Sequence, residues 1–258
     1  MAESTLSVSF ADIRTAVGDY LGIGMDPAGW TSADATRVAG IIKSGLARFY
    51  FNPIYSDWSF LKPVASLTTA ASQEEYALPD DFGHLISTLT WSSPRNRPYV
   101  NIIAEATYRQ IKGESPLQIG QPRVACVIPV KMAASVSPNV PVGQRFKIAL
   151  WPVPAGVYVF EYRYAVLPDA PSDMLYPYGG ASHGETILQS CLAVAEQRTN
   201  DSSSSNHQQL FERLLLGSIE RDRNQAAPHV IGKNTDAGLA RGSYTRPTIR
   251  ARINGVPQ

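Results

Sequence analysis

The first fifty residues show the spacing of apolar residues that is typical of two amphipathic helices. In S-F-A-D-I-R-T-A-V-G-D-Y-L, Ser9 and Asp12 have the spacing of a capping box, with Asp in place of the usual Glu. After the break G-I-G-M-D-P-A-G-W, a second helix is expected to start at Thr31 or Ser32 and to end before Asn52-Pro53. Each helix has one apolar face, so we expect an antiparallel pair. The two faces consist of Phe10, Ile13, Val17 and Leu21, and of Val38, Ile42, Leu46 and Phe49.

A second pair of helices is predicted near the other end of the chain, after L-P-D-A-P-S-D. The first is expected from His183 to Arg198, and the second follows the polar loop N-D-S-S-S-S-N and continues to Gln225. The simplest arrangement buries their apolar faces against those of the N-terminal helices, in one bundle. The shared faces consist of Ile187, Leu188, Cys191, Leu192 and Ala195, and of Leu210, Phe211, Leu214, Leu215 and Ile219.

Between the two helical pairs, from about Pro63 to Leu167, the pattern changes to that of strands. Short runs of β-branched and aromatic residues recur between Pro and Gly breaks, and A-E-A-T-Y-R-Q-I-K-G among them is more helical. These features predict a small antiparallel sandwich or barrel. The run V-Y-V-F-E-Y-R-Y-A-V alternates so that one face is aromatic. The other predicted strands are L-I-S-T-L-T-W, Y-V-N-I-I-A, R-V-A-C-V-I-P-V and F-K-I-A-L-W-P.

The pattern as a whole predicts an α+β protein. We expect a helical bundle of N- and C-terminal helices with an inserted antiparallel β sandwich or barrel, and an extended C-terminal arm. After Ala226 the periodicity ends, and a segment dominated by Gly, Pro, Asn, Thr and Arg cannot bury a core by itself. We therefore expect the arm to order against a partner. The expected parts are the N-terminal helical pair 1–62, the β domain 63–168, the C-terminal helical pair 169–226 and the arm 227–258.

The composition also shows where the basic charge lies along the chain. Hydrophobic residues make up 44% of the 258 residues, which is enough for a core, and the net charge is only +1. From Pro228 to Gln258, however, five basic residues face the single acidic residue Asp236, so the basic charge lies in the arm. Cys126 and Cys191 lie in apolar surroundings and are expected to be buried thiols in a reducing compartment.

The N-terminal sequence lacks the basic and apolar regions of a signal peptide, and no run of about 18 uninterrupted apolar residues occurs. We expect a protein that is made in the cytoplasm and has no membrane partner.

The sharpest polar cluster is Asp80-Asp81-x-x-His84. A metal site would need three or four convergent ligands, and acid–base catalysis would need carboxylates in a cleft. The same segment has the composition of a turn, in which Pro79 presets φ, Asp80 and Asp81 bond backbone N–H groups, and Gly83 supplies a positive φ. We predict a structural turn of Pro79, Asp80, Asp81 and Gly83. A metal-dependent hydrolase that uses Asp80, Asp81 and His84 is the alternative.

The remaining motifs do not indicate an enzyme. His183 and Glu185 lie where a helix is expected to begin, and a polar first turn is the simpler interpretation. The stretch G-I-I-K-S-G lies inside a predicted helix and is not a phosphate-binding loop, and neither HExxH nor G-x-S-x-G occurs. We therefore expect a non-enzymatic protein with no metal and no cofactor.

The basic arm suits either an acidic protein surface or a nucleic acid. Interleaved aromatic residues would favour nucleic acid, and Tyr244 is the only aromatic residue there. We favour docking onto a protein, and a solvated tail is the remaining interpretation. The residues assigned to docking are Lys233, Arg241, Tyr244, Arg246, Arg250 and Arg252.

Four segments occur in a fixed order along the helices and the β region. They are W-S-F-L at Trp58–Leu61, Y-A-L-P-D-D-F, the hairpin I-A-L-W-P-V-P-A-G-V-Y-V-F-E-Y-R-Y, and A-x-A-E at Ala193–Glu196. In this order, the segments resemble the head-to-tail adaptor, or connector, proteins of tailed bacteriophages, including the tail-tubular type of short-tailed phages. The resemblance covers about residues 8 to 225.

The resemblance implies a structural virion protein in the neck between capsid and tail. It implies a ring, commonly of twelve copies, whose partners are the portal protein, a tail or nozzle protein and further copies of the chain, with genomic DNA passing through the lumen as cargo. The bundle would pack around the ring, the β domain would face the tail, and the arm would reach into the portal. Its arginines would pair with portal carboxylates, and Ile231, Leu239 and Ile249 would occupy shallow grooves.

A third function class uses the β domain differently. It would be a receptor- or carbohydrate-binding sandwich at the tail tip, and the position of the protein in the virion distinguishes this module from an adaptor.

Overall fold

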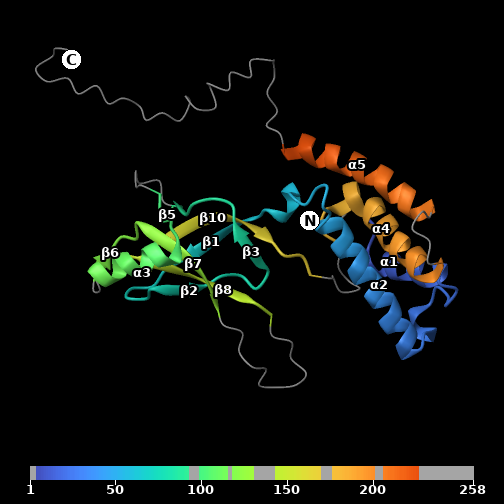
Figure 1. Cartoon of the computed structure of the whole chain (residues 1–258), viewed down its shortest axis with the longest axis horizontal. Coiled ribbons are helices and arrows are strands. Elements are labelled where there is room, and N and C mark those ends of the chain that lie inside the picture. Colours follow the sequence, from blue (N-terminus) through green and yellow to red (C-terminus); the bar gives the residue numbers. More distant parts are fainter. Residues whose placement is uncertain are drawn as a thin grey trace, which may run out of the picture.

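The computed structural model describes residues 4–92, 99–115, 118–130, 143–169, 176–200 and 206–226. All of the α-helices except one gather at one end of its long axis, and the strands lie at the other end together with the remaining helix (Figure 1). Residues 51–63 lead from the helices into the sheets, and the segment after residue 166 leads back.

Two capping boxes fix where the N-terminal helices begin. The Ser9 hydroxyl accepts the Asp12 N–H, and the Asp12 carboxylate accepts the Ser9 N–H at 2.9 Å. Thr31 and Asp34 form the same pair of hydrogen bonds. The predicted capping box and the predicted start of the second helix are therefore confirmed. The helices at this end are α1 (Phe10–Tyr20), α2 (Ser32–Tyr50), α4 (Gly180–Asn200) and α5 (Asn206–Ala226), with a short 3-10 turn η1 (Pro27–Gly29).

One apolar core holds these four helices together, and α4 packs against α1, α2 and α5. The α2–α4 contact is close at Gly45, whose carbonyl accepts the Ser190 hydroxyl at 2.8 Å. Cys191 is buried in this core, and Cys126 is buried in the β region, both as free thiols, as predicted. Fully buried side chains include Ile13 and Val17 of α1, Val38, Ile41, Ile42 and Phe49 of α2, Cys191 and Ala195 of α4, and Phe211 and Leu215 of α5.

The strands of the described ranges form three small sheets. In one, β10 pairs with β1, β3 and β4; the second has the order β2-β8-β7-β5, and the third pairs β6 with β9. Helix α3 (Glu105–Glu114), predicted from its composition, packs against β7. The strands are β1 (Val64–Thr68), β2 (Glu75–Ala77), β3 (Phe82–Leu85), β4 (Thr90–Trp91), β5 (Asn101–Ile102), β6 (Ile119–Gly120), β7 (Val124–Val130), β8 (Arg145–Trp151), β9 (Val153–Pro154) and β10 (Val159–Val166).

Strand β10 is central to the core of the sheets. Its buried and exposed residues alternate, and Phe160, Tyr162 and Tyr164 are buried. They pack with Phe82 of β3 and Ile148 of β8 in a core separate from that of the helices. The predicted aromatic face is thus confirmed.

The chain is α+β, as predicted, but three details of the β region are different. The predicted strand L-I-S-T-L-T-W is interrupted: β3 and β4 pair with different parts of β10. Strand β1 was not predicted, because Leu67 is its one buried residue and the pattern is weak. The expectation of purely antiparallel pairing is wrong, since β5 pairs with β7 and β6 with β9 in parallel.

Within the described ranges, no helix is long and apolar enough to span a membrane.

Candidate interaction site at the junction of helices and sheets

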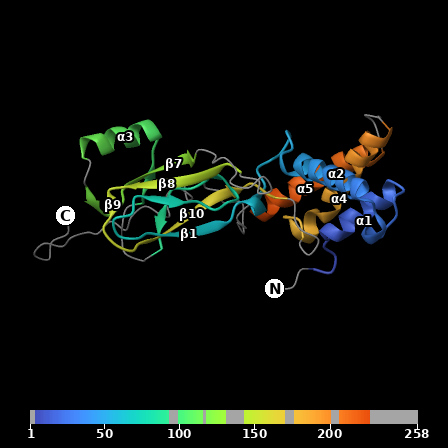
Figure 2. The same ribbon diagram turned by 90° about the horizontal axis from the view of Figure 1, so that it is seen from below.

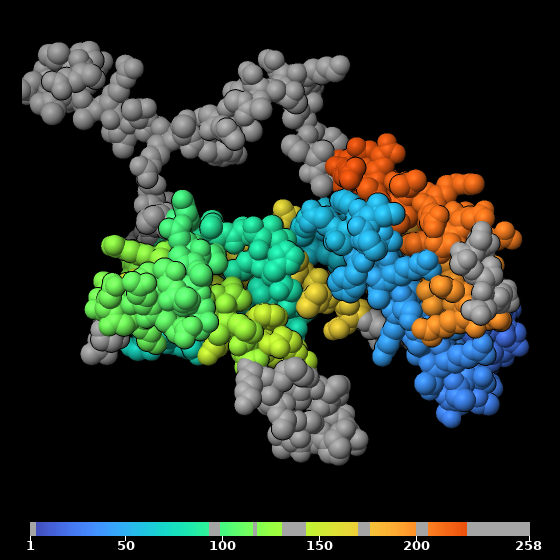
Figure 3. Space-filling model, in the orientation of Figure 1, coloured from blue at the N-terminus to red at the C-terminus, as the bar shows by residue number. Residues whose placement is uncertain are grey.

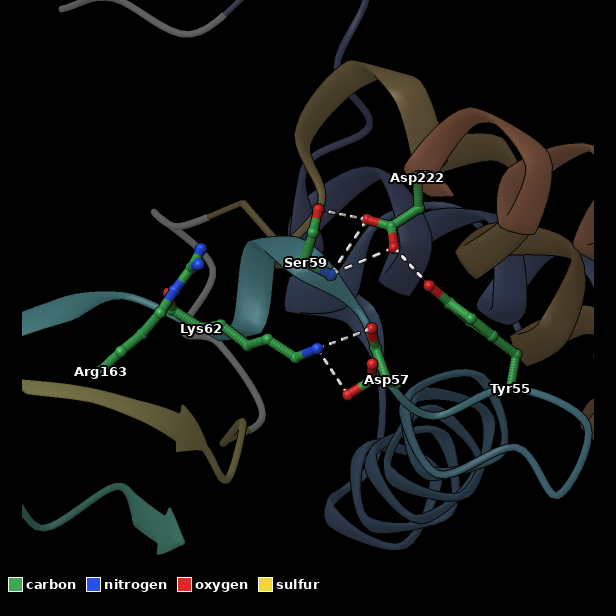
Figure 4. A network of polar contacts seen from close by, with 6 residues as sticks. All are labelled: Tyr55, Asp57, Ser59, Lys62, Arg163 and Asp222. Carbon is green, nitrogen blue, oxygen red and sulfur yellow. Dashed lines mark hydrogen bonds and ion pairs between the residues drawn. The ribbon is translucent and has the colours of Figure 1, made fainter. Parts of the chain in front are cut away.

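A buried carboxylate joins the last helix to the segment that enters the sheets. Asp222 lies near the end of α5 with no solvent exposure. It accepts the Tyr55 hydroxyl at 2.8 Å, the Ser59 hydroxyl at 2.6 Å and the Ser59 N–H at 3.1 Å (Figure 4). Ser59 begins the 3-10 turn η2 (Ser59–Leu61), so the carboxylate binds the start of that turn. The position of η2 is therefore tied to α5.

The same segment is also tied to the central strand of the sheets. The Lys62 carbonyl accepts the Arg163 Nε–H at 2.7 Å, and Arg163 lies on β10. The Lys62 ammonium binds both the carboxylate and the carbonyl of Asp57 (Figure 4). A continuous chain of polar contacts therefore runs from α5 through residues 55–62 to β10. We call Tyr55, Ser59, Lys62, Arg163 and Asp222 the junction network.

The protonation state of Tyr55 and the donors around Asp222 suit a network that holds the chain in position. Burial, and then the hydrogen bond to Asp222, raise the pKa of Tyr55 to about 12, although Arg223 near its ring acts in the opposite direction. Tyr55 therefore stays protonated and acts as a donor at neutral pH. Asp222 has its acceptor sites filled by protein donors, so the network holds the chain in place.

His183 lies beside this network in an aromatic box. It is 1% exposed, and its ring packs against Phe49, Trp58 and Phe60 at centroid distances of 6.2, 5.5 and 5.1 Å. Neither ring nitrogen has a hydrogen-bond partner in the described part of the chain. Burial, assisted by Arg221, lowers the pKa of His183, and Asp222 acts in the opposite direction. His183 lies in the first turn of α4, as predicted, but its side chain is buried in the core and does not belong to a polar surface.

The predicted turn contains a hydrogen bond from the Phe82 N–H to the Pro79 carbonyl, 3.0 Å long. The Asp80 carboxylate pairs with Arg145 at 2.9 Å, and Asp81 accepts the Tyr164 hydroxyl at 3.1 Å. The two carboxylates therefore bind side chains of β8 and β10 in place of the expected backbone N–H groups.

Gly83 and His84 also differ from the expectations for this segment. Gly83 lies in β3 without a positive φ, and a Cβ there would lie 3.0 Å from the Ala165 carbonyl oxygen. The close approach of β10, and not a positive φ, therefore explains why this position holds a glycine. His84 is exposed on β3, and among the described residues no group of three His, Cys, Asp or Glu could hold a metal ion. The alternative that joins Asp80, Asp81 and His84 in a metal site is therefore wrong.

The predicted docking arm, with Lys233, Arg241, Tyr244, Arg246, Arg250 and Arg252, lies outside the described residues. The same holds for His229.

The helices, sheets and junction network all fall within one match to a family model. The model of the SU10 adaptor protein family matches residues 8–232. The chain belongs to the SU10 adaptor protein family. The comparison with curated proteins gave no match. Membership of the SU10 adaptor family agrees with the resemblance to phage head-to-tail adaptors and implies a structural role.

In this SU10 adaptor, the junction network was not predicted from the sequence, although one signal was present. Leu215, Ile219 and Asp222 follow helical spacing, which places the carboxylate on the apolar stripe of α5. A charged residue on such a stripe needs buried donors. The donors, Tyr55 and Ser59, are more than 160 residues away in the sequence, at separations of 167 and 163.

We expect the stability of this SU10 adaptor to fall between pH 7 and pH 5, in part because of His183. The folded state favours the neutral imidazole, so its contribution is complete above the reference pKa of 6.5 and is lost as the pH falls through the lowered folded pKa. His183→Phe should reduce the loss of stability between pH 7 and pH 5, as measured by urea unfolding at both pH values.

The matched control for this experiment is His84→Gln, because His84 is exposed on β3. It should leave the pH dependence unchanged. An equal pH dependence in the wild type and in His183→Phe would show that His183 does not contribute.

Proposed function

We propose that this member of the SU10 adaptor protein family is the head-to-tail adaptor of a phage virion. It forms a ring in the neck, between the portal and the tail or nozzle protein, and genomic DNA passes through the lumen. The observation on which this proposal rests is the family match over residues 8–232. The ring holds twelve copies, as in the adaptors that the sequence resembles, and the chain is made in the host cytoplasm.

The architecture supports separate roles for the helices and the sheets within each copy. The helices have one core and the sheets have another, so each part can contact a different partner. We assign residues 1–62 and 169–226 to a bundle that packs around the ring. Residues 63–168 form the inserted β sandwich that faces the tail. The turn of Pro79, Asp80, Asp81 and Gly83 shapes one edge of this sandwich, since Asp80 pairs with Arg145 of β8.

The arm 227–258 docks onto the portal. It follows α5 in the sequence, and the last turns of α5 are anchored by Asp222 through the junction network. Lys233, Arg241, Arg246, Arg250 and Arg252 pair with carboxylates of the portal, and Tyr244 contributes an aromatic contact.

Deletion of residues 228–258 should leave the body folded and abolish portal binding. Two charge-assisted hydrogen bonds of about 1.5 kcal/mol each already correspond to a loss of about 100-fold in affinity. Binding of the truncated chain to a purified portal ring, together with its melting temperature, measures both effects.

A matched control keeps the arm but replaces its five basic residues by glutamine. It separates the effect of the arm's charge on portal binding from the effect of its length. Full portal affinity after truncation would remove the arm from the proposal. Sedimentation of the wild-type chain alone and with a portal ring tests the ring itself. Labelling at the tail tip, in place of the neck, would favour the receptor-binding alternative.

A further inference from the structure

Three arginines line a hollow on the helical end. Its volume is about 830 Å³, and it is lined by Arg37, Ser44 and Arg48 of α2 and by Val194, Gln197 and Arg198 of α4. We call these six residues the arginine hollow. Among the residues that the structure describes, no acidic residue contributes to the lining. Helix α4 lies between α2 and α5 here, and all three helices reach the surface (Figures 1 and 3).

Two of the three arginines of the hollow, Arg48 and Arg198, are held in place by contacts that do not neutralise their charge. One Arg198 nitrogen donates to the Ser44 hydroxyl at 2.6 Å, and the Arg48 guanidinium stacks 5.5 Å from the centre of the Phe211 ring. Among the described residues, no ion pair joins Arg37, Arg48 or Arg198 to a carboxylate. Guanidinium groups that are not paired with a carboxylate favour an anionic partner.

The opposite charge gathers on α1 and the loop that follows it. Residues 4–31, which comprise α1 and its flanking loops, include three aspartates and one basic residue, Arg14. Asp12, Asp19 and Asp26 are exposed, and Asp12 and Asp19 lie about two turns apart on the same side of α1. We call these three aspartates the acidic face. Met25, next to Asp26, is 62% exposed and offers apolar contact area beside the charges.

The two surfaces lie on different elements of the helical end. The hollow is formed by α2 and α4, and the acidic face by α1 and the loop that follows it; Figure 2 shows these helices together at one end of the molecule. A ring of identical copies needs two different surfaces that fit one another, since each copy contacts its two neighbours through opposite sides.

We propose that the arginine hollow of one copy receives the acidic face of the next copy. This pairing rests on the proposed ring and identifies the contact that closes it. Charge complementarity between two surfaces of one chain favours a second copy as the partner, because a neighbouring copy supplies the acidic charge that pairs with the hollow. The exposed Met25 also suits a protein surface better than a phosphate backbone.

The test uses two charge-reversed forms of the full-length chain. Arg37→Glu with Arg198→Glu makes the hollow acidic, and Asp19→Arg with Asp26→Arg makes the acidic face basic. Each form alone should need at least about ten-fold more protein to assemble, because like charges then face one another. An equimolar mixture should assemble again, with the two forms alternating in equal numbers. Native mass spectrometry of the assemblies, formed alone or on a portal ring, gives the masses and the ratio.

The matched control reverses two exposed arginines far from the hollow, Arg109→Glu with Arg123→Glu, and should assemble as the wild type does. Wild-type chains that stay monomeric even with a portal ring would overturn the ring and this pairing together. A ring that survives either reversal, or a mixture that does not recover, would overturn the pairing alone. The pairing would also be overturned if the form with Arg37→Glu and Arg198→Glu retained less double-stranded DNA but assembled as the wild type does.

Discussion

Gly45→Ala is expected to lower the free energy of unfolding by about 3 kcal/mol, because overpacking at a backbone contact cannot be relieved by a rotamer change. A Cβ at Gly45 would lie 2.6 Å from both the Cα and the Sγ of Cys191, and 2.9 Å from its backbone nitrogen. Helices α2 and α4 would have to separate, which also stretches the hydrogen bond from Ser190 to the Gly45 carbonyl. Urea unfolding followed by circular dichroism measures the loss.

The control for this experiment lies on the same helix. A Cβ at Gly40 would meet only the Arg198 guanidinium, at 3.6 Å, so Gly40→Ala should be neutral or stabilising by up to about 1 kcal/mol through helix propensity. Equal stability of Gly40→Ala and Gly45→Ala would contradict the importance of the close contact between α2 and α4.

The helical end could be predicted because its signals are local. Apolar spacing and the Ser9–Asp12 pair depend on residues within one or two turns of each other, and the structure places α1 where they indicate. The aromatic face of β10 was predictable for the same reason, since alternation within eight residues reports burial directly.

The rest of the β region depends on partners far away in the sequence. Strands β3 and β4 are separate because they pair with different ends of β10, and β1 exists because it pairs with Val159–Arg163. Neither pairing leaves a strong local pattern. The parallel pairs β5–β7 and β6–β9 are likewise set by how the chain returns across the sheets.

The candidate functional residues also divide into those that local sequence features predict and those that depend on partners far away in the sequence. The arm was predicted from composition alone and stays a prediction, because it lies outside the described residues. Gly45 falls in G-I-I-K-S-G, where the sequence offers no reason for a glycine, and the reason is Cys191 on another helix. His183 looked like a polar first turn because its three aromatic neighbours come from α2 and from residues 58–60.

Asp222→Ala is expected to destabilise the protein by about 3 kcal/mol or more. The change removes one buried acceptor and leaves the Ser59 N–H and the Tyr55 hydroxyl without a partner, and each buried donor left unsatisfied costs about 1–3 kcal/mol. Because Ser59 and Lys62 connect α5 to β10, the effect should concentrate at the junction. Hydrogen exchange should show faster exchange of the Ser59 amide and of residues 55–62 than of the core of α2.

Two variants distinguish the effect of losing the network's hydrogen bonds from the effect of losing a negative charge. Tyr55→Phe removes a single hydrogen bond and should cost about 1 kcal/mol, while Asp57→Asn, at a side chain that is 80% exposed, should change stability by less than about 0.5 kcal/mol. If Asp222→Ala lost stability without faster exchange at residues 55–62, the carboxylate would stabilise only the helical core. The predicted pattern instead makes Asp222 the residue through which α5 and the sheets keep a fixed relative position.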